Sequence, residues 1–253
     1  MSRSLVCADI ESRPDLDTTP LSETWQYGCG YKPEAASIAT LLLRKGADIE
    51  GRDSKGRSIL ASVAAFGNAH GVRWLVENGA DIESQDDEGR TPLARAAASL
   101  VGAQGVTALL QAGANVNSVG RDGKSPLHMA IIGEGRFEVI KQLLEHGADT
   151  EQRDDHGRTA LSYAADRQKD IRLVKMLLEK GANVHSTDDR GRTPLFWATG
   201  NDALGHIALD LIESGADVNA KDQDGKTPLA LACEETGSPE IAVLLRERGA
   251  RME

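Results

Sequence analysis

The sequence predicts an all-α repeat solenoid, because two short phrases recur along the chain at almost the same interval. In the first phrase, a threonine or serine stands two places before a leucine, and its copies are 33 residues apart once and then 34 residues apart four times. A Gly-Ala pair keeps the same interval. Two phrases with one period indicate a single supersecondary unit in tandem copies, which bury their apolar faces against each other. The first phrase begins at Ser58, Thr91, Ser125, Thr159, Thr193 and Thr227, and the Gly-Ala pairs begin at Gly46, Gly79, Gly113, Gly147, Gly181, Gly215 and Gly249.

Each unit begins with a turn and a short helix, as residues 154–187 illustrate. Residues 154–157 have the sequence Asp-Asp-His-Gly, which predicts a turn because glycine takes positive φ and aspartate bonds its own backbone. Thr159 then follows as the predicted N-cap of a short helix that continues to about Ala165. Most sister units carry proline at the next position, which a first helical turn accommodates.

A longer helix and an extended arm complete the unit. Ile171, Val174, Leu177 and Leu178 recur at helical spacing, and Gly181 is placed to end this helix as a C′ glycine. Residues 182–184 then lead as an extended arm into the next turn. A unit of this kind has no core of its own, so we expect neighbouring units to stack.

The Gly-x-Thr-Pro-Leu phrase, the Leu-Leu-x-x-Gly-Ala-Asp ending and the Asp-x-x-Gly turn resemble the ankyrin-repeat family over residues 19–253. The resemblance implies about seven repeats, stacked as helix-turn-helix units with extended hairpin-like turns. It also implies that the face of the short helices lines a concave groove. One departure is that the histidine that usually follows Thr-Pro-Leu in the family occurs here only as His128.

The chain divides into a short beginning and one repeat domain. Residues 19–253 are expected to form a single domain whose last repeat, 227–253, is a capping repeat, because Arg246 stands where the other units carry an apolar residue. Residues 1–18 are interpreted as a partial repeat or N-terminal arm, since residues 7–12 are similar to the arm at 79–84.

Composition disfavours several classes of partner and site. The formal net charge of −10 disfavours nucleic acid, and no apolar run is long enough to insert into a membrane. The start of the chain has no apolar stretch typical of a signal peptide. The three cysteines are scattered, which favours a reducing compartment, and we therefore expect the cytoplasm or the nucleus.

Three short patterns imitate ligand sites but lack an essential residue. Residues 123–125 and 225–227 end like a phosphate loop, yet Ser118 and Ala220 replace its first glycine. Residues 222–225 begin like a calcium loop, but Cys233 stands where the bidentate glutamate is required. No catalytic residue, metal ligand or cofactor site is therefore predicted.

Several side chains are better explained by structure or solvation. Cys233 occupies a slot that holds alanine in sister units, which predicts that it lies in the core. His156 and His185 fall on a turn and an arm, where a solvated surface position is expected.

A basic residue precedes each copy of the first phrase, and an aspartate recurs in the turn four residues earlier. We call the basic residues the ladder; its two interpretations are a surface network neutralised by the aspartates, or a charge pattern that sets the register of a partner. The ladder consists of Arg57, Arg90, Lys124, Arg158, Arg192 and Lys226, and the aspartates are Asp53, Asp86, Asp154, Asp188 and Asp222.

An apolar stripe follows the phrase at a fixed position, where Met129, Tyr163, Trp197 and Leu231 succeed one another. These residues either fill the space between short helices or anchor a partner in the groove. Phe196, beside Trp197, is expected to be buried.

The predicted function is a monomeric, non-catalytic scaffold that binds a protein or peptide in the groove. An enzyme with a small-molecule site grafted on the repeats, or the targeting region of a larger multidomain protein, stays open as an alternative. The predicted partner-binding residues are Arg95, Arg121, Met129, Arg158, Tyr163, Arg192, Trp197 and Asn201.

Overall fold

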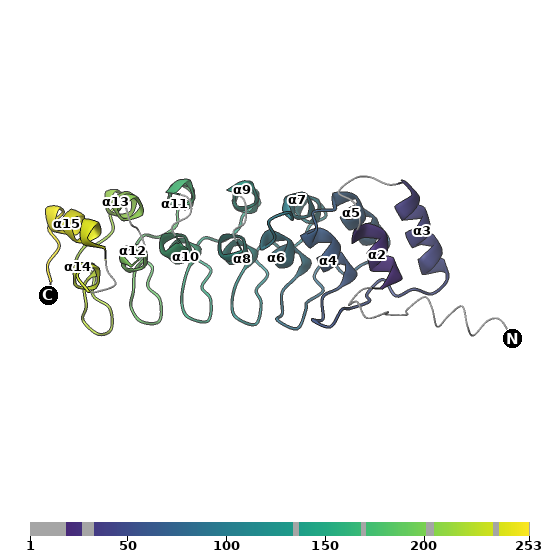
Figure 1. The fold of residues 1–253 in the computed structure, drawn as a ribbon, viewed down its shortest axis with the longest axis horizontal. Coiled ribbons are helices and arrows are strands. Elements are labelled where there is room, and N and C mark those ends of the chain that lie inside the picture. The colour runs from purple at the N-terminus through teal and green to yellow at the C-terminus, as the bar shows by residue number, and fades with distance from the viewer. Residues whose placement is uncertain are drawn as a thin grey trace. The chain divides into compact units, whose positions relative to one another are not determined.

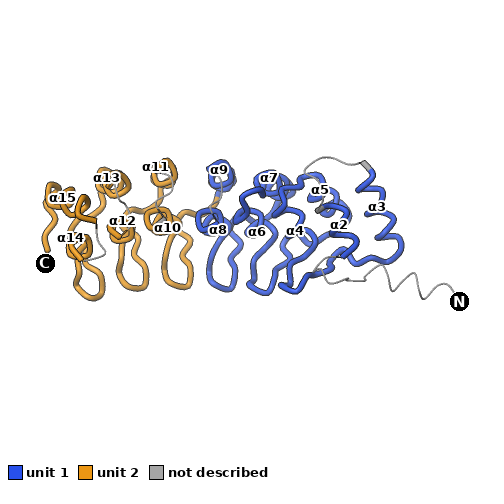
Figure 2. The backbone as a smooth tube through the Cα atoms, viewed as in Figure 1, with its two compact units in different colours: residues 1–147 blue, residues 148–253 orange. Residues whose placement is uncertain are grey.

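A computed structural model describes residues 19–26, 33–133, 137–167, 171–200, 205–234 and 238–252. The chain forms two compact units, residues 1–147 and residues 148–253 (Figure 2). Both units consist of helix pairs joined by long turns, and the described residues contain no strand beyond one isolated bridge between Arg52 and Ser58. The predicted all-α fold is confirmed.

In the first unit, each pair combines a first helix with a second helix of nine or more residues (Figure 1). First helices pack on the first helices of adjacent pairs, and α5 and α7 pack on α7 and α9 respectively. The pairs are α2 (Pro20–Gln26) with α3 (Pro33–Arg44), α4 (Ile59–Ala65) with α5 (Ala69–Glu77), α6 (Pro92–Ala97) with α7 (Ala103–Gln111), and α8 (Pro126–Ile132) with α9 (Phe137–Glu145).

The second unit repeats this arrangement. Its first helices form one layer and its second helices another, and the long turns protrude from the first-helix layer (Figure 1). The pairs are α10 (Ala160–Arg167) with α11 (Ile171–Glu179), α12 (Pro194–Thr199) with α13 (His206–Glu213), and α14 (Pro228–Ala232) with α15 (Pro239–Glu247). We call the surface of turns and first helices in this unit the hairpin face.

Each first helix begins one residue after the serine or threonine of the phrase, as predicted. Ser58 and Thr91 cap their helices by accepting a hydrogen bond from the backbone N–H three residues on, and Ser125 and Thr227 do the same. Thr193 is an exception, because its hydroxyl makes no capping bond and has no partner among the described residues.

The second helices end at glycines, as predicted. Gly181 has a φ of 88°, and the N–H of Ala182 donates back to the Leu177 carbonyl over 3.0 Å. Glycine is required here because an L side chain is strained at this φ. The chain then leaves the helix at the angle needed to reach the next turn.

The core lies between the two helix layers. The leucine of each phrase is at most 2% exposed, and Val174 and Leu177 of α11 are fully buried. Phe196 is 2% exposed, which confirms the expectation from its sequence position.

The last helix pair differs from the others in its exposed residues. The prediction that Cys233 lies in the core is wrong, since its thiol is exposed and 3.3 Å from Arg246 Nη2. Cys233 follows α14, which packs on α12 and α15, and no other described helix covers the slot that holds alanine elsewhere. Arg246, on the last described helix, is also exposed. The predicted partial repeat at residues 1–18 lies outside the described residues.

None of the described helices is both long and apolar enough to cross a membrane.

Candidate partner-binding site

The aspartates of the turns hold the backbone of the hairpin face in place. Asp154 is 5% exposed, and its Oδ1 accepts hydrogen bonds of 2.9 Å from the backbone N–H groups of His156 and Arg158. Asp188 and Asp222, each 7% exposed, repeat this arrangement in the next two turns. One carboxylate oxygen therefore holds each turn in a hairpin-like conformation.

The second oxygen, Oδ2, differs from one turn to the next. In the second unit, Tyr163 donates its hydroxyl to Asp154 Oδ2 over 2.6 Å, and Arg192 Nε lies 3.5 Å from Asp222 Oδ2. In the first unit, Asp53 Oδ2 is paired with Arg57 and Asp86 Oδ2 with Arg95. Four of these five aspartates thus use both oxygens.

Asp188 is the exception. No described residue donates a hydrogen bond to its Oδ2 or forms an ion pair with it. In two other turns, the residue nine positions after the aspartate supplies the donor: Arg95 for Asp86 and Tyr163 for Asp154. Here that position is Trp197, and its Nε1–H makes no hydrogen bond within the described part of the chain.

Arg158 connects the two aromatic residues of the hairpin face. Its Cζ lies 4.0 Å from the centroid of the Tyr163 ring and 3.8 Å from the centroid of the Trp197 ring. Its Nη2 is 3.0 Å from Asp166 Oδ2 and donates to the Ser162 carbonyl over 3.3 Å. Cation–π attraction at both rings, together with the carboxylate, fixes the position of the indole.

These side chains border a depression of about 310 Å³, which we call the Trp197 pocket. It lies between two neighbouring turns and the first helices that follow them. Trp197 is half-buried in its wall, whereas His156, Asp189 and Arg190 are exposed on the turns. The lining residues are His156, Arg158, Tyr163, Asp188, Asp189, Arg190 and Trp197.

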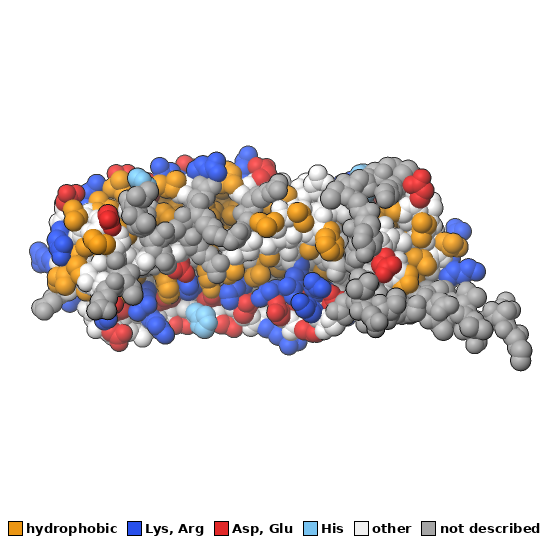
Figure 3. All heavy atoms as spheres, viewed as in Figure 1, with side chains coloured by type: hydrophobic (Ala, Val, Ile, Leu, Met, Phe, Trp, Pro, Cys, Tyr) orange, Lys and Arg blue, Asp and Glu red, His pale blue; other side chains and the backbone are white. Residues whose placement is uncertain are grey.

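The ladder is neutralised within each unit. Figure 3 shows basic and acidic side chains interspersed along the edges where the turns lie. This favours the first interpretation of the ladder, a surface network with little net field of its own. The pairs are Arg57 with Asp53, Arg90 with Glu88 and Asp122, Lys124 with Asp122, Arg158 with Asp166, Arg192 with Asp222, and Lys226 with Glu234.

The pKa values of two ionisable groups in this network are shifted. Burial raises the pKa of Asp122, but the hydrogen bonds and charge of Lys124 and the charge of Arg90 outweigh it, so the pKa lies below its ordinary value. The hydrogen bond and charge of Glu234 raise the pKa of Lys226. Both groups therefore stay charged at neutral pH.

The structure brings four of the eight predicted site residues together: Arg158, Tyr163, Arg192 and Trp197, with Arg192 Cζ 5.8 Å from the Trp197 centroid. Tyr163 is only 7% exposed, so its ring supports Arg158 rather than offering surface.

Three other predicted residues belong to the first unit. Met129 is 5% exposed, and Arg95 is paired with Asp86 and Glu88. Arg121 is exposed, and its backbone N–H donates to the Glu88 carbonyl over 2.9 Å. The eighth predicted residue, Asn201, lies outside the described residues.

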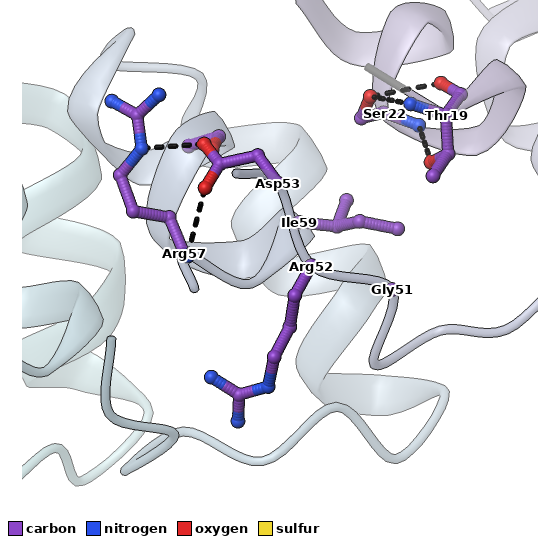
Figure 4. A pocket seen from close by; sticks show the side chains of 8 residues that line it. Thr19, Ser22, Gly51, Arg52, Asp53, Arg57 and Ile59 are labelled. Atoms are coloured by element: carbon purple, nitrogen blue, oxygen red, sulfur yellow. Dashed lines mark hydrogen bonds and ion pairs between the residues drawn. The ribbon is translucent and has the colours of Figure 1, made fainter. Parts of the chain in front are cut away.

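A second depression, in the first unit, is too small for a ligand (Figure 4). Its volume is about 10 Å³, about the least that can hold one water molecule, and Arg57 and Asp53 pair at 2.5 Å in its wall. Among the described residues, no group of three histidine, cysteine or acidic side chains is arranged to hold a metal ion.

Comparisons with known proteins agree with the fold. A family model described as ankyrin repeats (3 copies) matches residues 29–119, 97–188 and 165–253. The structure is similar to the ankyrin repeat domain of Bcl-3, described as a unique member of the IkappaB protein family, with a TM-score of 0.72, 28% identity and coverage of 90% of this chain and 98% of that chain. It is also similar to the human ASB11 ankyrin repeat domain, with a TM-score of 0.75, 25% identity and coverage of 93% and 100%. A search of curated protein sequences found no match.

Proposed function

Because this chain belongs to the ankyrin-repeat family, we propose that it is a non-catalytic scaffold for protein interactions, which binds an extended segment of its partner on the hairpin face at the Trp197 pocket. The observation that carries the proposal is Trp197 itself. A half-buried tryptophan in the wall of an open depression is the kind of residue that dominates binding energy at protein interfaces.

The indole also has an unused hydrogen-bond donor. Trp197 Nε1 is buried and has no partner among the described residues, although buried indole N–H groups usually have one. A small shift of the ring on binding would let a partner's carbonyl accept this hydrogen bond.

The pocket is arranged before any partner arrives. Arg158 is held by Tyr163, Trp197 and Asp166, so little side-chain freedom remains to be lost on binding. Preorganisation of this kind raises affinity, because it lowers the entropic cost of forming the complex.

The dimensions of the hairpin face suit a peptide. Three turns of the second unit, beginning at Asp154, Asp188 and Asp222, follow one another at helix spacings of ~8–10 Å. They span roughly 20 Å, which about six extended residues would cover at ~3.3 Å each.

The proposal is tested by selecting peptides from a displayed random library against the whole protein and mapping one binder by NMR. We expect the largest amide and indole shifts in residues 154–199. Shifts that centre on the second helices, or a library that yields no binder, would refute the proposed site.

A further inference from the structure

We infer that the Trp197 pocket takes a basic side chain, lysine or arginine, from the partner segment, with Asp188 Oδ2 as its main contact. This inference rests on the proposed function and adds the chemistry of the residue that the pocket selects.

The first support is the unused oxygen of Asp188. The carboxylate is 7% exposed and lines the pocket, and none of the described residues pairs with its Oδ2. This oxygen is still reached by solvent, and a cation that also donates a hydrogen bond is the strongest complement for a carboxylate oxygen without a protein partner.

The equivalent turns show what this oxygen binds elsewhere. Arginine pairs with Oδ2 of Asp53, Asp86 and Asp222, and the Tyr163 hydroxyl donates to Oδ2 of Asp154. Three of four equivalent positions therefore hold a guanidinium group. In the Asp188 turn, no described residue takes this position next to Oδ2, and Trp197 lines the same pocket.

The charged side chains that line the pocket balance formally. Asp188 and Asp189 stand against Arg158 and Arg190, which gives 2 − 2 = 0.

The two arginines differ in their availability. Arg158 is committed to Asp166 and to the two rings, and Arg190 is exposed on the turn, where solvent screens it. The net charge of −10 for the whole chain favours the approach of a basic partner.

The shape of the pocket also suits a basic side chain. Lysine and arginine carry an apolar stem that packs along aromatic surface while the charged end reaches a polar group. Trp197 supplies that surface and Asp188 the polar group, and the depression of about 310 Å³ has room for one such side chain.

The test uses the whole protein and four acetylated, amidated pentapeptides that have alanine at every position except the centre, which is lysine, arginine, glutamate or norleucine. The readout is the indole N–H resonance of Trp197, identified by its absence in Trp197→Phe. We expect the lysine and arginine peptides to shift this resonance in a saturable way, and the other two not to.

Asp188→Asn should weaken binding of the lysine peptide by about tenfold. This variant keeps one oxygen for the two backbone N–H groups, so the turn is retained. Asp222→Asn is the matched control, because its Oδ2 is already occupied by Arg192, and it should leave the affinity unchanged.

Three results would overturn the inference: no saturable shift with either basic peptide, equal binding of the norleucine peptide, or tighter binding of the glutamate peptide through Arg158 and Arg190. A library-selected binder that maps to residues 154–199 but contains no lysine or arginine would leave the proposed function intact and reject the cation.

Discussion

The guanidinium of Arg158 lies between the rings of Tyr163 and Trp197, with its Cζ 4.0 Å from one centroid and 3.8 Å from the other. The three side chains come from two successive repeats, so this stack both joins the repeats and orients the indole of the proposed site. Its energetic role can be separated from binding by substitution.

Arg158→Ala should lower the free energy of unfolding by about 1–2 kcal/mol, because it removes two cation–π contacts and the pair with Asp166. Urea unfolding measures this. Arg192→Ala is the matched control from the next turn, since its Cζ is 5.8 Å from the same ring, and its cost should be smaller. Equal costs would contradict a specific role for the stack.

Tyr163→Phe should cost about 1 kcal/mol while leaving the stack in place. The variant keeps the ring beneath Arg158 but removes the hydroxyl that donates to Asp154 Oδ2 over 2.6 Å. Urea unfolding gives the cost, and near-ultraviolet circular dichroism reports whether the aromatic environment is retained. A neutral substitution would show that the bond contributes nothing.

Two threonines in the same Gly-Arg-Thr-Pro-Leu sequence should respond differently to alanine. Thr91→Ala removes a capping bond to the Ala94 N–H and should cost about 1 kcal/mol. Thr193→Ala removes a hydroxyl that makes no capping bond and should cost less. Identical costs in thermal unfolding would contradict the difference in capping.

The pH dependence of stability should follow Asp122. The folded-state pKa of Asp122 lies below the ordinary value of 3.8. Its contribution to the free energy of unfolding is therefore fully present above pH 3.8 and is lost as the pH falls through the folded-state pKa. Asp122→Asn should therefore destabilise the protein at pH 7 by less than about 1 kcal/mol, because the group is partly exposed. The difference from the wild type should vanish in strong acid, and a difference that persists there would rule out this linkage.

Most of the fold could be predicted from the sequence, because local signals and the repeat period agree. Gly181 is required by its positive φ, and Ser125 by the first turn of α8, so both positions could be assigned from residue type and spacing alone. The positions of Phe196 and Trp197 could also be separated, since one faces the core and the other the hairpin face.

Less of the site could be predicted. In the sequence, Asp188 looks the same as its four counterparts, because all stand at the same place in an Asp-x-x-Gly or equivalent turn. Asp188 differs because Trp197, nine residues later, donates no hydrogen bond to it. In addition, Arg158 of the preceding turn pairs with Asp166, whereas Arg192 pairs with Asp222 of the turn that follows it. Both differences depend on packing between repeats. The sequence signal that distinguishes the Asp188 turn is Trp197, which stands where Arg95 and Tyr163 stand after their own aspartates.

The most direct test of the central claim is the affinity of a library-selected peptide for Trp197→Ala, measured by calorimetry on the whole protein. We predict a loss of about 2 kcal/mol or more, with most of the stability retained. Trp74→Ala is the matched control, because Trp74 is also a half-buried tryptophan but lies on the second helix α5, and it should leave the affinity unchanged. Unchanged affinity in Trp197→Ala, or unfolding of this variant before binding is lost, would contradict the account.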